Sequence, residues 1–436
     1  MKFGGTSVGT PLRMREVAQL ISSGSEQKIV VLSAVSGTTN SLVTISNLLL
    51  ENNKVDAKEK IDELEKHYKQ FITDLVKTPA ALENANEVLR EHFEFLNIIL
   101  KISYSEALNK DILAQGELLS TKLFSVFLQE QQVKHLLVPA LDFMVLDVNN
   151  EPQVDVIREK LTSKLKQDPA AQIIITQGFI CRNAKGEVDN LKRGGSDYTA
   201  SLIAAAIKAS ACEIWTDISG MHNNDPRVVD KTRPIEQLSF NEAAELAYFG
   251  AKILHPASIW PAQQYNIPVK LLNTMEPAAK GTLISEKALS QGVKAIAAKD
   301  GITAINIKSS RMLLAHGFLR KVFEVFEKYK TSIDMITTSE VAVSVTIDNT
   351  ISLKEIQAEL EKFSSVEVDT HQCIVCIVGN EIGSDYTILK DVFQNLDGVP
   401  VRMVSFGGSV HNVSLLIPEK EKVNVLKQLN KGLFNL

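Results

Sequence analysis

Hydrophobic runs alternate with helical stretches along the first two thirds of the chain. Apolar segments rich in β-favouring residues at 28–34, 172–180, 212–217 and 267–273 predict buried strands, and each gives way to glycine or polar residues near its end. This alternation is typical of α/β folds, in which an open parallel sheet binds ligands beyond the carboxyl ends of its strands. Residues 54–113 form a long, charged and mainly helical insertion, which we expect to be a surface lobe or a dimer contact.

One helix can be placed closely from its end signals. In SFNEAAELAYFGAK, Ser239 and Glu242 have the spacing of a capping box, and Gly250 is suited to ending the helix. Lys252 is then expected on a loop just past the helix, where its amine can reach a ligand.

After about residue 295 the pattern changes to β-α-β-β-α-β, and this order occurs twice before the chain ends. A doubled pattern of this kind predicts two ferredoxin-like modules related by a weak internal repeat. Neither copy carries a cluster of convergent catalytic residue types. We therefore interpret both copies as regulatory or assembly modules.

Composition narrows the class of protein. The chain has 436 residues, enough for two or three domains, and its net charge of −5 gives no electrostatic footprint for nucleic acid or an anionic membrane. No apolar run approaches the roughly 20 residues that span a bilayer, and the first residues contain glycines where a signal peptide would be apolar. We expect a cytoplasmic enzyme.

The cysteines do not indicate a disulfide framework or a metal site. There are four of them, Cys181, Cys212, Cys373 and Cys376, which is too few for a framework in a chain of this length. The CIVC segment at 373–376 lies in an apolar, β-rich run, and residues three apart on a strand point to opposite faces. We expect these two cysteines to be small strand hydrophobes.

Four glycine-rich or charged motifs stand out in the α/β part. They are KFGGTS with Lys2, Gly4, Gly5, Thr6 and Ser7; GTTN at 37–40; KRGGSDYTA with Ser196 and Asp197; and TDISGMHNNDPR with Thr216, Asp217 and Arg227. Taken singly, each is explained equally well by a helix cap or a turn. Together they place glycines, hydroxyls and basic residues at strand ends, which favours polyphosphate binding. The Walker A and dinucleotide-binding patterns are absent from the sequence.

The combination of these motifs resembles the aspartate kinases. KFGGTS, QGE at 115–117, RGGSDYTA, TDISG…DPR, FGAKILHP and GTLIS follow one another in the family's order over the whole chain. The resemblance implies an α/β amino-acid-kinase fold at 1–294, a mainly parallel sheet between helical layers, followed by ACT domains at 295–371 and 372–436 that are either consecutive or intertwined. SIDMITTSE is similar to the lysine-sensitive, monofunctional type.

The resemblance also implies a reaction and a set of site residues. The reaction is transfer of a phosphoryl group from MgATP to the β-carboxylate of L-aspartate, the first step of lysine, threonine and methionine biosynthesis. The implied roles are Lys2 and Asp197 in catalysis; Thr39, Glu117, Arg193, Gly194, Gly195 and Ser196 in binding aspartate; and Lys2, Gly4, Gly5, Thr6, Ser7, Thr216, Asp217, His222, Arg227 and Lys252 in binding nucleotide. Mg²⁺ is expected to travel with the phosphates, without a named protein ligand.

Two positions depart from the family pattern. Relatives have more apolar residues ahead of the lysine that corresponds to Lys2, so the first strand is short here. Relatives also usually have tyrosine at the position of His222.

Regulation is expected in the first ACT module. The implied binding residues for an inhibitory L-lysine are Met312, Ile333, Asp334, Thr338, Ser339 and Glu340, in a homodimer formed through the ACT domains. The alternative for Asp334 and Glu340 is that they only mark a β-turn-β edge. Two other functions stay open: another carboxylate kinase of the same fold, acting on glutamate or acetylglutamate, or a non-catalytic amino-acid sensor. Retention of Lys2, Glu117, Arg193 and Asp197 argues against the sensor.

Overall fold

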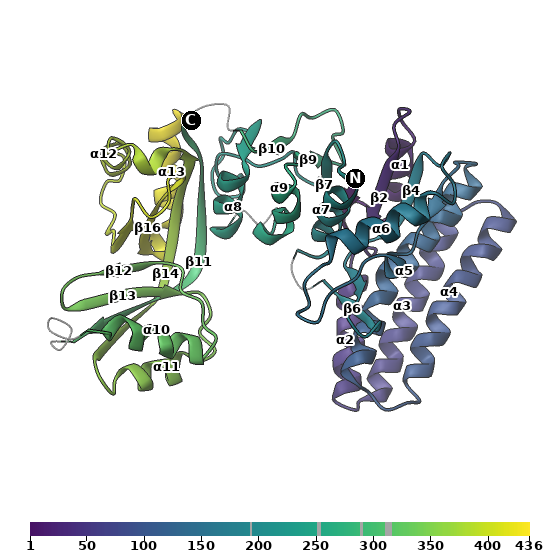
Figure 1. The fold of residues 1–436 in the computed structure, drawn as a ribbon, viewed down its shortest axis with the longest axis horizontal. Coiled ribbons are helices and arrows are strands. Elements are labelled where there is room, and N and C mark those ends of the chain that lie inside the picture. The colour runs from purple at the N-terminus through teal and green to yellow at the C-terminus, as the bar shows by residue number, and fades with distance from the viewer. Residues whose placement is uncertain (192–193, 251–253, 288–290, 310–315) are drawn as a thin grey trace. The chain divides into compact units, whose positions relative to one another are not determined.

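The computed structural model describes residues 1–191, 194–250, 254–287, 291–309 and 316–436 (Figure 1). They form two compact units. The first comprises Met1–Met221 and Leu254–Glu286, and the second His222–Ile253 and Lys287–Leu436. Each unit is described by itself.

A mainly parallel sheet forms the centre of the first unit. Its strands follow in the order β3-β4-β2-β1-β7-β9-β10, and only β9 and β10 pair antiparallel among these neighbours in the described part of the chain. The strands are β1 (Lys2–Phe3), β2 (Lys28–Leu32), β3 (Leu136–Leu137), β4 (Ile173–Gln177), β7 (Cys212–Thr216), β9 (Val269–Asn273) and β10 (Thr282–Ser285). The strands expected at 28–34, 212–217 and 267–273 are confirmed. The run at 172–180 forms β4 and then the start of β5 (Ile180–Arg182), which pairs with β6 (Val188–Asn190).

The short strand β1 lies at the centre of this sheet. Lys2 pairs with Val31 of β2 on one side and with Ile214 of β7 on the other. Phe3 is fully buried and stacks on Trp215, with 5.8 Å between the ring centroids. Two flanking strands and a buried aromatic side chain therefore hold the residues that lead into the KFGGTS loop.

Helices cover both faces of the sheet because neighbouring strand residues point to opposite sides. The helices α1 (Pro11–Ile21) and α2 (Thr38–Leu50) share one hydrophobic cluster with Val30 and Leu32, whereas α7 (Gly195–Ile207) packs against β1, β2 and β7 outside that cluster. The unit also contains η1 (Ala140–Asp142), α6 (Val154–Leu165), η2 (Pro256–Ser258) and α9 (Trp260–Gln264).

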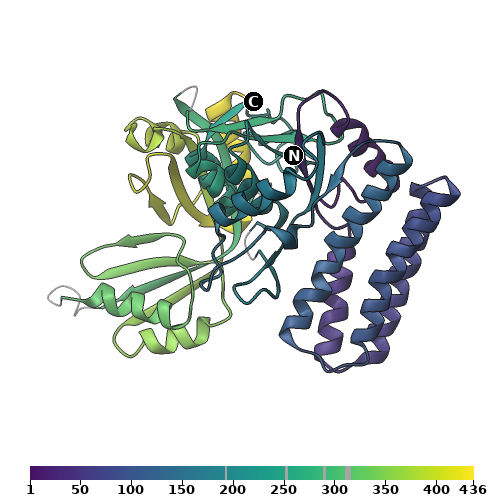
Figure 2. The ribbon, with the colours of Figure 1, turned by 45° about the vertical axis from the view of Figure 1, so that its right-hand side comes forward.

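Three long helices occupy the segment expected to be a helical insertion. They are α3 (Lys54–Leu75), α4 (Pro79–Ile99) and α5 (Glu106–Glu130), and α5 continues well beyond residue 113. With α2 they lie side by side as a bundle (Figure 1, Figure 2). Their inward faces carry Tyr68, Phe71, Phe93 and other apolar residues of the same hydrophobic cluster that contains Val30.

The second unit begins with β8 (Gln237–Ser239) and α8 (Phe240–Tyr248). The capping box is confirmed: Glu242 N–H donates to Ser239 Oγ at 3.2 Å, and Ser239 N–H donates to Glu242 Oε2 at 2.6 Å. Gly250 follows the helix with φ +122°, and an added Cβ would lie 2.2 Å from the carbonyl oxygen of Ala298. Glycine is therefore required at this position both by conformation and by space. Lys252 lies outside the described residues.

The doubled β-α-β-β-α-β pattern forms one antiparallel sheet in the order β12-β13-β11-β14-β16-β15. The strands are β11 (Gly292–Lys308), β12 (Ile336–Thr338), β13 (Ala342–Ile347), β14 (Ser365–Asn380), β15 (Met403–Ser405) and β16 (Asn412–Pro418), and the helices are α10 (Phe318–Lys328), α11 (Leu353–Leu360), η4 (Ile382–Ser384), α12 (Ile388–Gln394), η5 (Glu419–Glu421) and α13 (Lys422–Phe434). The first β-α-β-β-α-β copy is confirmed as β11 to β14, whereas the second copy adds α12, β15, β16 and α13 and shares the long strands β11 and β14 with the first.

The two modules are intertwined through their longest strands. Ile305 and Ile307 of β11 pack in one core with α10 and α11, whereas Ile296 of the same strand packs in a second core with α12 and α13. In strand β14, Val366 likewise packs against the first core, and Val375 belongs to the second. The limit expected between the modules, at 371–372, lies inside β14.

Cys373 and Cys376 lie on β14, and all four cysteines of the chain are buried free thiols. Cys373 belongs to the second core, which does not include Cys376, as expected for residues three apart on a strand. Every helix in the described ranges is too short or too polar to span a lipid bilayer.

Candidate active site

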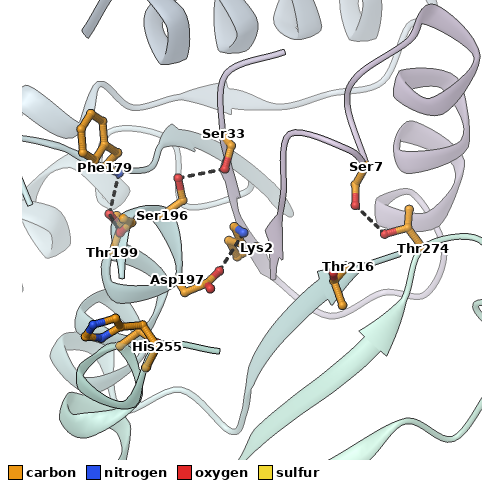
Figure 3. A network of polar contacts seen from close by, with 12 residues as sticks. Lys2, Ser7, Ser33, Phe179, Ser196, Asp197, Thr199, Thr216, His255 and Thr274 are labelled. Carbon is orange, nitrogen blue, oxygen red and sulfur yellow. Dashed lines mark hydrogen bonds and ion pairs between the residues drawn. The ribbon is translucent and has the colours of Figure 1, made fainter. Parts of the chain in front are cut away.

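An ion pair between Lys2 and Asp197 lies at the centre of the candidate site (Figure 3). Lys2 belongs to β1 and Asp197 to the first turn of α7, and Lys2 Nζ is 2.7 Å from Asp197 Oδ1. The two side chains are 13% and 16% exposed, so the pair is largely desolvated yet still open to a ligand. Desolvation strengthens the interaction and fixes the direction of the ammonium group.

The glycine loop connects β1 to α1 and passes directly beside this ammonium. An added Cβ on Gly4 would lie 3.3 Å from Lys2 Nζ, and one on Gly5 would lie 3.1 Å from the carbonyl oxygen of Ala34. Thr6 is exposed, whereas Ser7 is fully buried and its hydroxyl is 2.7 Å from Thr274 Oγ1. The Ser7 side chain therefore holds the loop in place, and the backbone and Thr6 remain accessible.

Glu117 is buried behind the end of β2. The backbone N–H of Ala34 donates to Glu117 Oε1 at 3.3 Å, and Glu117 Oε2 has no hydrogen-bond partner among the described residues. The residue is 4% exposed, and burial raises the pKa of its carboxyl group to about 7, despite the hydrogen bond from Ala34. Gly116 allows this approach, because an added Cβ would lie 2.9 Å from Ala34 Cβ.

The start of α7 is packed closely against two other segments. Ser33 Oγ donates to Ser196 Oγ at 2.9 Å, and an added Cβ on Gly178 would lie 2.2 Å from Ser196 Oγ. Gly194 has φ +66°, and a Cβ there would lie 2.5 Å from Ser258 Cβ. Gly195 follows with φ +50° as the first helical residue. The first-turn N–H groups of a helix have no intrahelical partners and attract anions.

Two further predicted residues belong to the segments that follow β2 and β7. Thr39 is half-buried in the first turn of α2, which begins at Thr38 directly after Gly37 with φ +83°. Thr216 ends β7, and its hydroxyl donates to Asp217 Oδ1 at 3.1 Å. The Thr216 carbonyl accepts a hydrogen bond from Thr274 N–H at 2.8 Å, which links it to the residue that anchors Ser7.

His222 and Arg227 belong to the second unit. His222 Nδ1 is 3.0 Å from Thr232 Oγ1, and burial lowers the pKa of its imidazole, so the ring is neutral near pH 7. The Arg227 guanidinium group makes two hydrogen bonds to the Asp225 carboxylate, at 2.9 and 2.8 Å, and the Arg227 side chain is 76% exposed. Arg193, Lys252 and Met312 lie outside the described residues.

Among the residues expected to bind an effector, Asp334 is the one with buried charge. Asp334 precedes β12 in the chain, and its side chain is 1% exposed. Its Oδ1 accepts hydrogen bonds from Lys299 Nζ at 2.8 Å and from the Tyr248 hydroxyl at 2.9 Å. Lys299 also pairs with Asp348 at 2.8 Å and lies over the Tyr248 ring, 4.6 Å from its centroid. A cavity of about 260 Å³ borders Asp334, Tyr248 and Glu245.

The other predicted effector residues are more open. Ile333 is half-buried, and Thr338, Ser339 and Glu340 are exposed at the turn between β12 and β13, where Ser339 N–H donates to the Ala342 carbonyl at 2.8 Å.

Sequence reasoning missed several residues that shape the site. Ser33, the Ala34 N–H, Gly178 and Thr274 were not singled out, although each directly follows a buried strand. A glycine immediately after the strand at 173–177 was the available signal for Gly178. The contacts of these residues depend on which strands are neighbours, and the order of strands in a sheet cannot be read from the local pattern.

The donor groups of the site do not form a metal cage. Within the described residues no group of three or more histidines, cysteines or carboxylates is placed to hold a metal ion.

Comparison with known proteins assigns two parts of the chain to known families. The model of the amino acid kinase family matches residues 1–273, and an ACT domain model matches residues 375–433. The chain is 34% identical to lysine-sensitive aspartokinase 3 of Escherichia coli over 99% of its length and 98% of that protein. It is 34% identical to the chloroplastic aspartokinase 3 of Arabidopsis thaliana over its whole length and 81% of that protein.

Solved structures of E. coli aspartokinase III agree with these matches. Its complex with aspartate and ADP, titled R-state, superposes with a TM-score of 0.84 at 33% identity and covers 99% of both chains. Its complex with lysine and aspartate, titled T-state, gives a TM-score of 0.82 at 34% identity and covers 99% of this chain and 98% of the other.

Proposed function

The chain belongs to the aspartokinases, within the amino acid kinase family, and we propose that it transfers the γ-phosphoryl group of MgATP to the β-carboxylate of L-aspartate. The products are 4-phospho-L-aspartate and ADP. The observation that carries the proposal is the largely desolvated Lys2–Asp197 pair at the end of the central strand, beside a glycine loop and a helix N-terminus. This is the arrangement that the transfer of a charged phosphoryl group requires.

The chemistry needs alignment and charge compensation. One oxygen of the β-carboxylate attacks the γ-phosphorus, and the bond from that phosphorus to the bridging oxygen breaks, with the electron pair leaving on ADP. The nucleophile is already ionised, so no proton has to be removed. Lys2 stabilises the negative charge that spreads over the transferring group, and Asp197 holds the Lys2 ammonium in place.

The aspartate pocket is proposed to lie beside the start of α7. The Glu117 carboxylate pairs with the substrate ammonium, and the ion pair offsets the cost of burying the Glu117 charge. Arg193 binds a carboxylate through two hydrogen bonds. Thr39, Gly194, Gly195 and Ser196 complete the pocket with hydroxyl and backbone N–H groups.

The nucleotide is proposed to contact Lys2, Gly4, Gly5, Thr6 and Ser7. Thr6 would contribute its exposed hydroxyl group, and Ser7 its backbone N–H group. Thr216, Asp217, His222, Arg227 and Lys252 are the remaining proposed contacts. Mg²⁺ is proposed to enter bound to the phosphates and to keep much of its water.

L-Lysine is proposed as the allosteric inhibitor, bound in the first ACT module of a homodimer. Asp334 supplies the buried carboxylate that a desolvated ammonium requires. The Lys299 ammonium contacts Asp334 Oδ1, so the ammonium of an effector would compete with this internal cation. The Tyr248 hydroxyl of α8 donates to the same oxygen of Asp334. Displacement of Lys299 by the bound effector would therefore change the contact between α8 and the ACT sheet. A coupling of about 1–3 kcal/mol between two arrangements is typical of such regulation.

The test is an ADP-release assay with aspartate, glutamate and N-acetylglutamate as acceptors, each with and without lysine or threonine. We expect turnover of aspartate and inhibition by lysine. Preferential turnover of glutamate or acetylglutamate would assign another carboxylate kinase of this fold, and MgATP binding without any turnover would assign an amino-acid sensor.

A further inference from the structure

The helical insertion makes a polar contact with the aspartate-binding side of the candidate site. Tyr68 of α3 is fully buried, and its hydroxyl lies 2.7 Å from Thr38 Oγ1. Thr38 is 2% exposed and is the first residue of α2, directly before Thr39. A residue from the insertion is therefore hydrogen-bonded to the turn that presents a proposed substrate contact.

The turn before α2 is closed by a backbone hydrogen bond from Thr38 N–H to the Val35 carbonyl at 3.0 Å, and no side chain caps the helix. Its cap residue Gly37 has φ +83° and no side chain to accept the first N–H groups of the helix, which a serine, threonine or aspartate would do. Thr38 is instead held between two elements of the bundle. Its hydroxyl bonds to Tyr68, and its methyl group faces Gly116 of α5, where an added Cβ would lie 3.4 Å from Thr38 Cγ2.

The same hydroxyl pair lies near the proposed ammonium partner. Thr38 packs beside Gly116, the residue before Glu117, since an added Cβ on Gly116 would lie 3.4 Å from Thr38 Cγ2. Burial and the negative charge of Glu117 both raise the pKa of Tyr68. Helix α5 is anchored independently by α4, since His92 Nδ1 lies 2.6 Å from Oε1 of Gln115, two residues before Glu117. The two helices that carry Thr39 and Glu117, α2 and α5, are thus both hydrogen-bonded to residues of the insertion.

We propose that Tyr68 is a positioning residue for L-aspartate binding, acting through Thr38 on the first turn of α2. This inference rests on the proposed function. A purely structural tyrosine would be replaceable by phenylalanine, because its ring already packs against Phe71 and Phe93, with centroids 6.1 and 6.3 Å away. The hydroxyl adds one hydrogen bond, and that bond ends at the turn beside Thr39 rather than elsewhere in the core.

The chain offers a matched control for this hydroxyl. Tyr104 also reaches α2 from the insertion, and its hydroxyl lies 2.6 Å from Ser46 Oγ, which is buried and also donates to Asn109 Oδ1. Ser46 lies two turns along α2 from Thr38. Tyr104→Phe therefore removes an equivalent bond between the same two parts of the fold without touching the turn at Gly37.

The experiment measures kcat and the KM values for aspartate and MgATP in Tyr68→Phe and Tyr104→Phe. We expect Tyr68→Phe to raise the KM for aspartate about 3- to 10-fold, as the loss of one buried hydrogen bond predicts, with the KM for MgATP within about twofold of wild type. Tyr104→Phe should leave both KM values unchanged. An unchanged KM for aspartate in Tyr68→Phe, or an equal rise in Tyr104→Phe, would overturn the proposal.

Thr38→Val alone provides a second measurement if Tyr68→Phe folds poorly, and where both variants fold a double-mutant cycle tests their coupling. Thr38→Val removes the same bond from the other side and should raise the KM for aspartate by a similar factor. The double variant leaves no unpaired hydroxyl, so its KM should lie well below the product of the two single effects. Fully multiplicative effects would refute coupling through this bond. Turnover of aspartate by the unmodified protein tests the proposed function separately.

Discussion

Glu117→Gln is the substitution for which the structure gives the most specific expectation. The carboxyl group is 4% exposed, one of its oxygens has no partner among the described residues, and burial raises its pKa to about 7. If the ionised form binds the ammonium group of aspartate, the apparent affinity for aspartate must follow the ionised fraction of Glu117. Glutamine keeps the shape and removes the titration.

The size of the effect follows from the pKa. With a pKa of about 7, the KM for aspartate exceeds the KM of the fully ionised enzyme by a factor of about 11 at pH 6, about 2 at pH 7 and about 1.1 at pH 8. The KM should therefore fall about tenfold between pH 6 and pH 8 in the wild type. In Glu117→Gln it should be higher at pH 8 and nearly independent of pH.

The same shift predicts how stability depends on pH. The pKa of Glu117 in the folded protein is above the ordinary value of 4.5 for a glutamic acid side chain, so the folded state binds the proton more tightly than the unfolded chain. The stabilisation is complete below pH 4.5 and is lost as pH rises through 7, with a total of up to ~3 kcal/mol. Without aspartate, Glu117→Gln should thus gain stability relative to wild type between pH 6 and pH 8.

The assay is ADP release at saturating MgATP over pH 6–8.5, together with thermal unfolding of both proteins without ligand. Aspartate should raise the Tm of the wild type more at pH 8 than at pH 6, because the ionised carboxylate gains a partner. A KM for aspartate that stays flat across this range in the wild type, with Glu117→Gln giving the same value, would refute the assignment of Glu117 to the ammonium group.

Three further substitutions test other parts of the molecule. Lys2→Ala should lower kcat by about 10²–10³ with little change in MgATP binding, since the transferring group loses one preorganised charge; a near-normal kcat in a folded variant would exclude Lys2 from the mechanism. Gly178→Ala should lower the free energy of unfolding, measured with denaturant, by about 1–3 kcal/mol and reduce activity, because the added Cβ would lie 2.2 Å from Ser196 Oγ. A variant as stable as the wild type would show that α7 can shift freely. Asp334→Ala should leave uninhibited activity close to normal and move the lysine inhibition curve to much higher concentration; inhibition of the wild type by threonine and not by lysine would contradict the effector assignment.

The sequence determined the features that depend on local patterns. Apolar runs predicted the strands β2, β4, β7 and β9 but not β3 or β10, and the Ser239–Glu242 spacing predicted a capping box that the structure contains. The motif order indicated the family, and the family comparison confirmed it. These signals are readable because each depends on a few neighbouring residues or on the spacing of a motif.

Tertiary structure decided which of these segments meet. Lys2 and Asp197 are far apart in the chain, and their 2.7 Å contact arises because β1 lies beside β7, against which α7 packs. The burial that raises the pKa of Glu117 comes from the close packing of α5 on the end of β2. The hydrogen bonds from Lys299 and Tyr248 to Asp334 likewise could not be predicted from the local sequence pattern. Hydrophobic periodicity specifies which face of an element is buried, whereas strand order and long-range contacts select the partner that buries it.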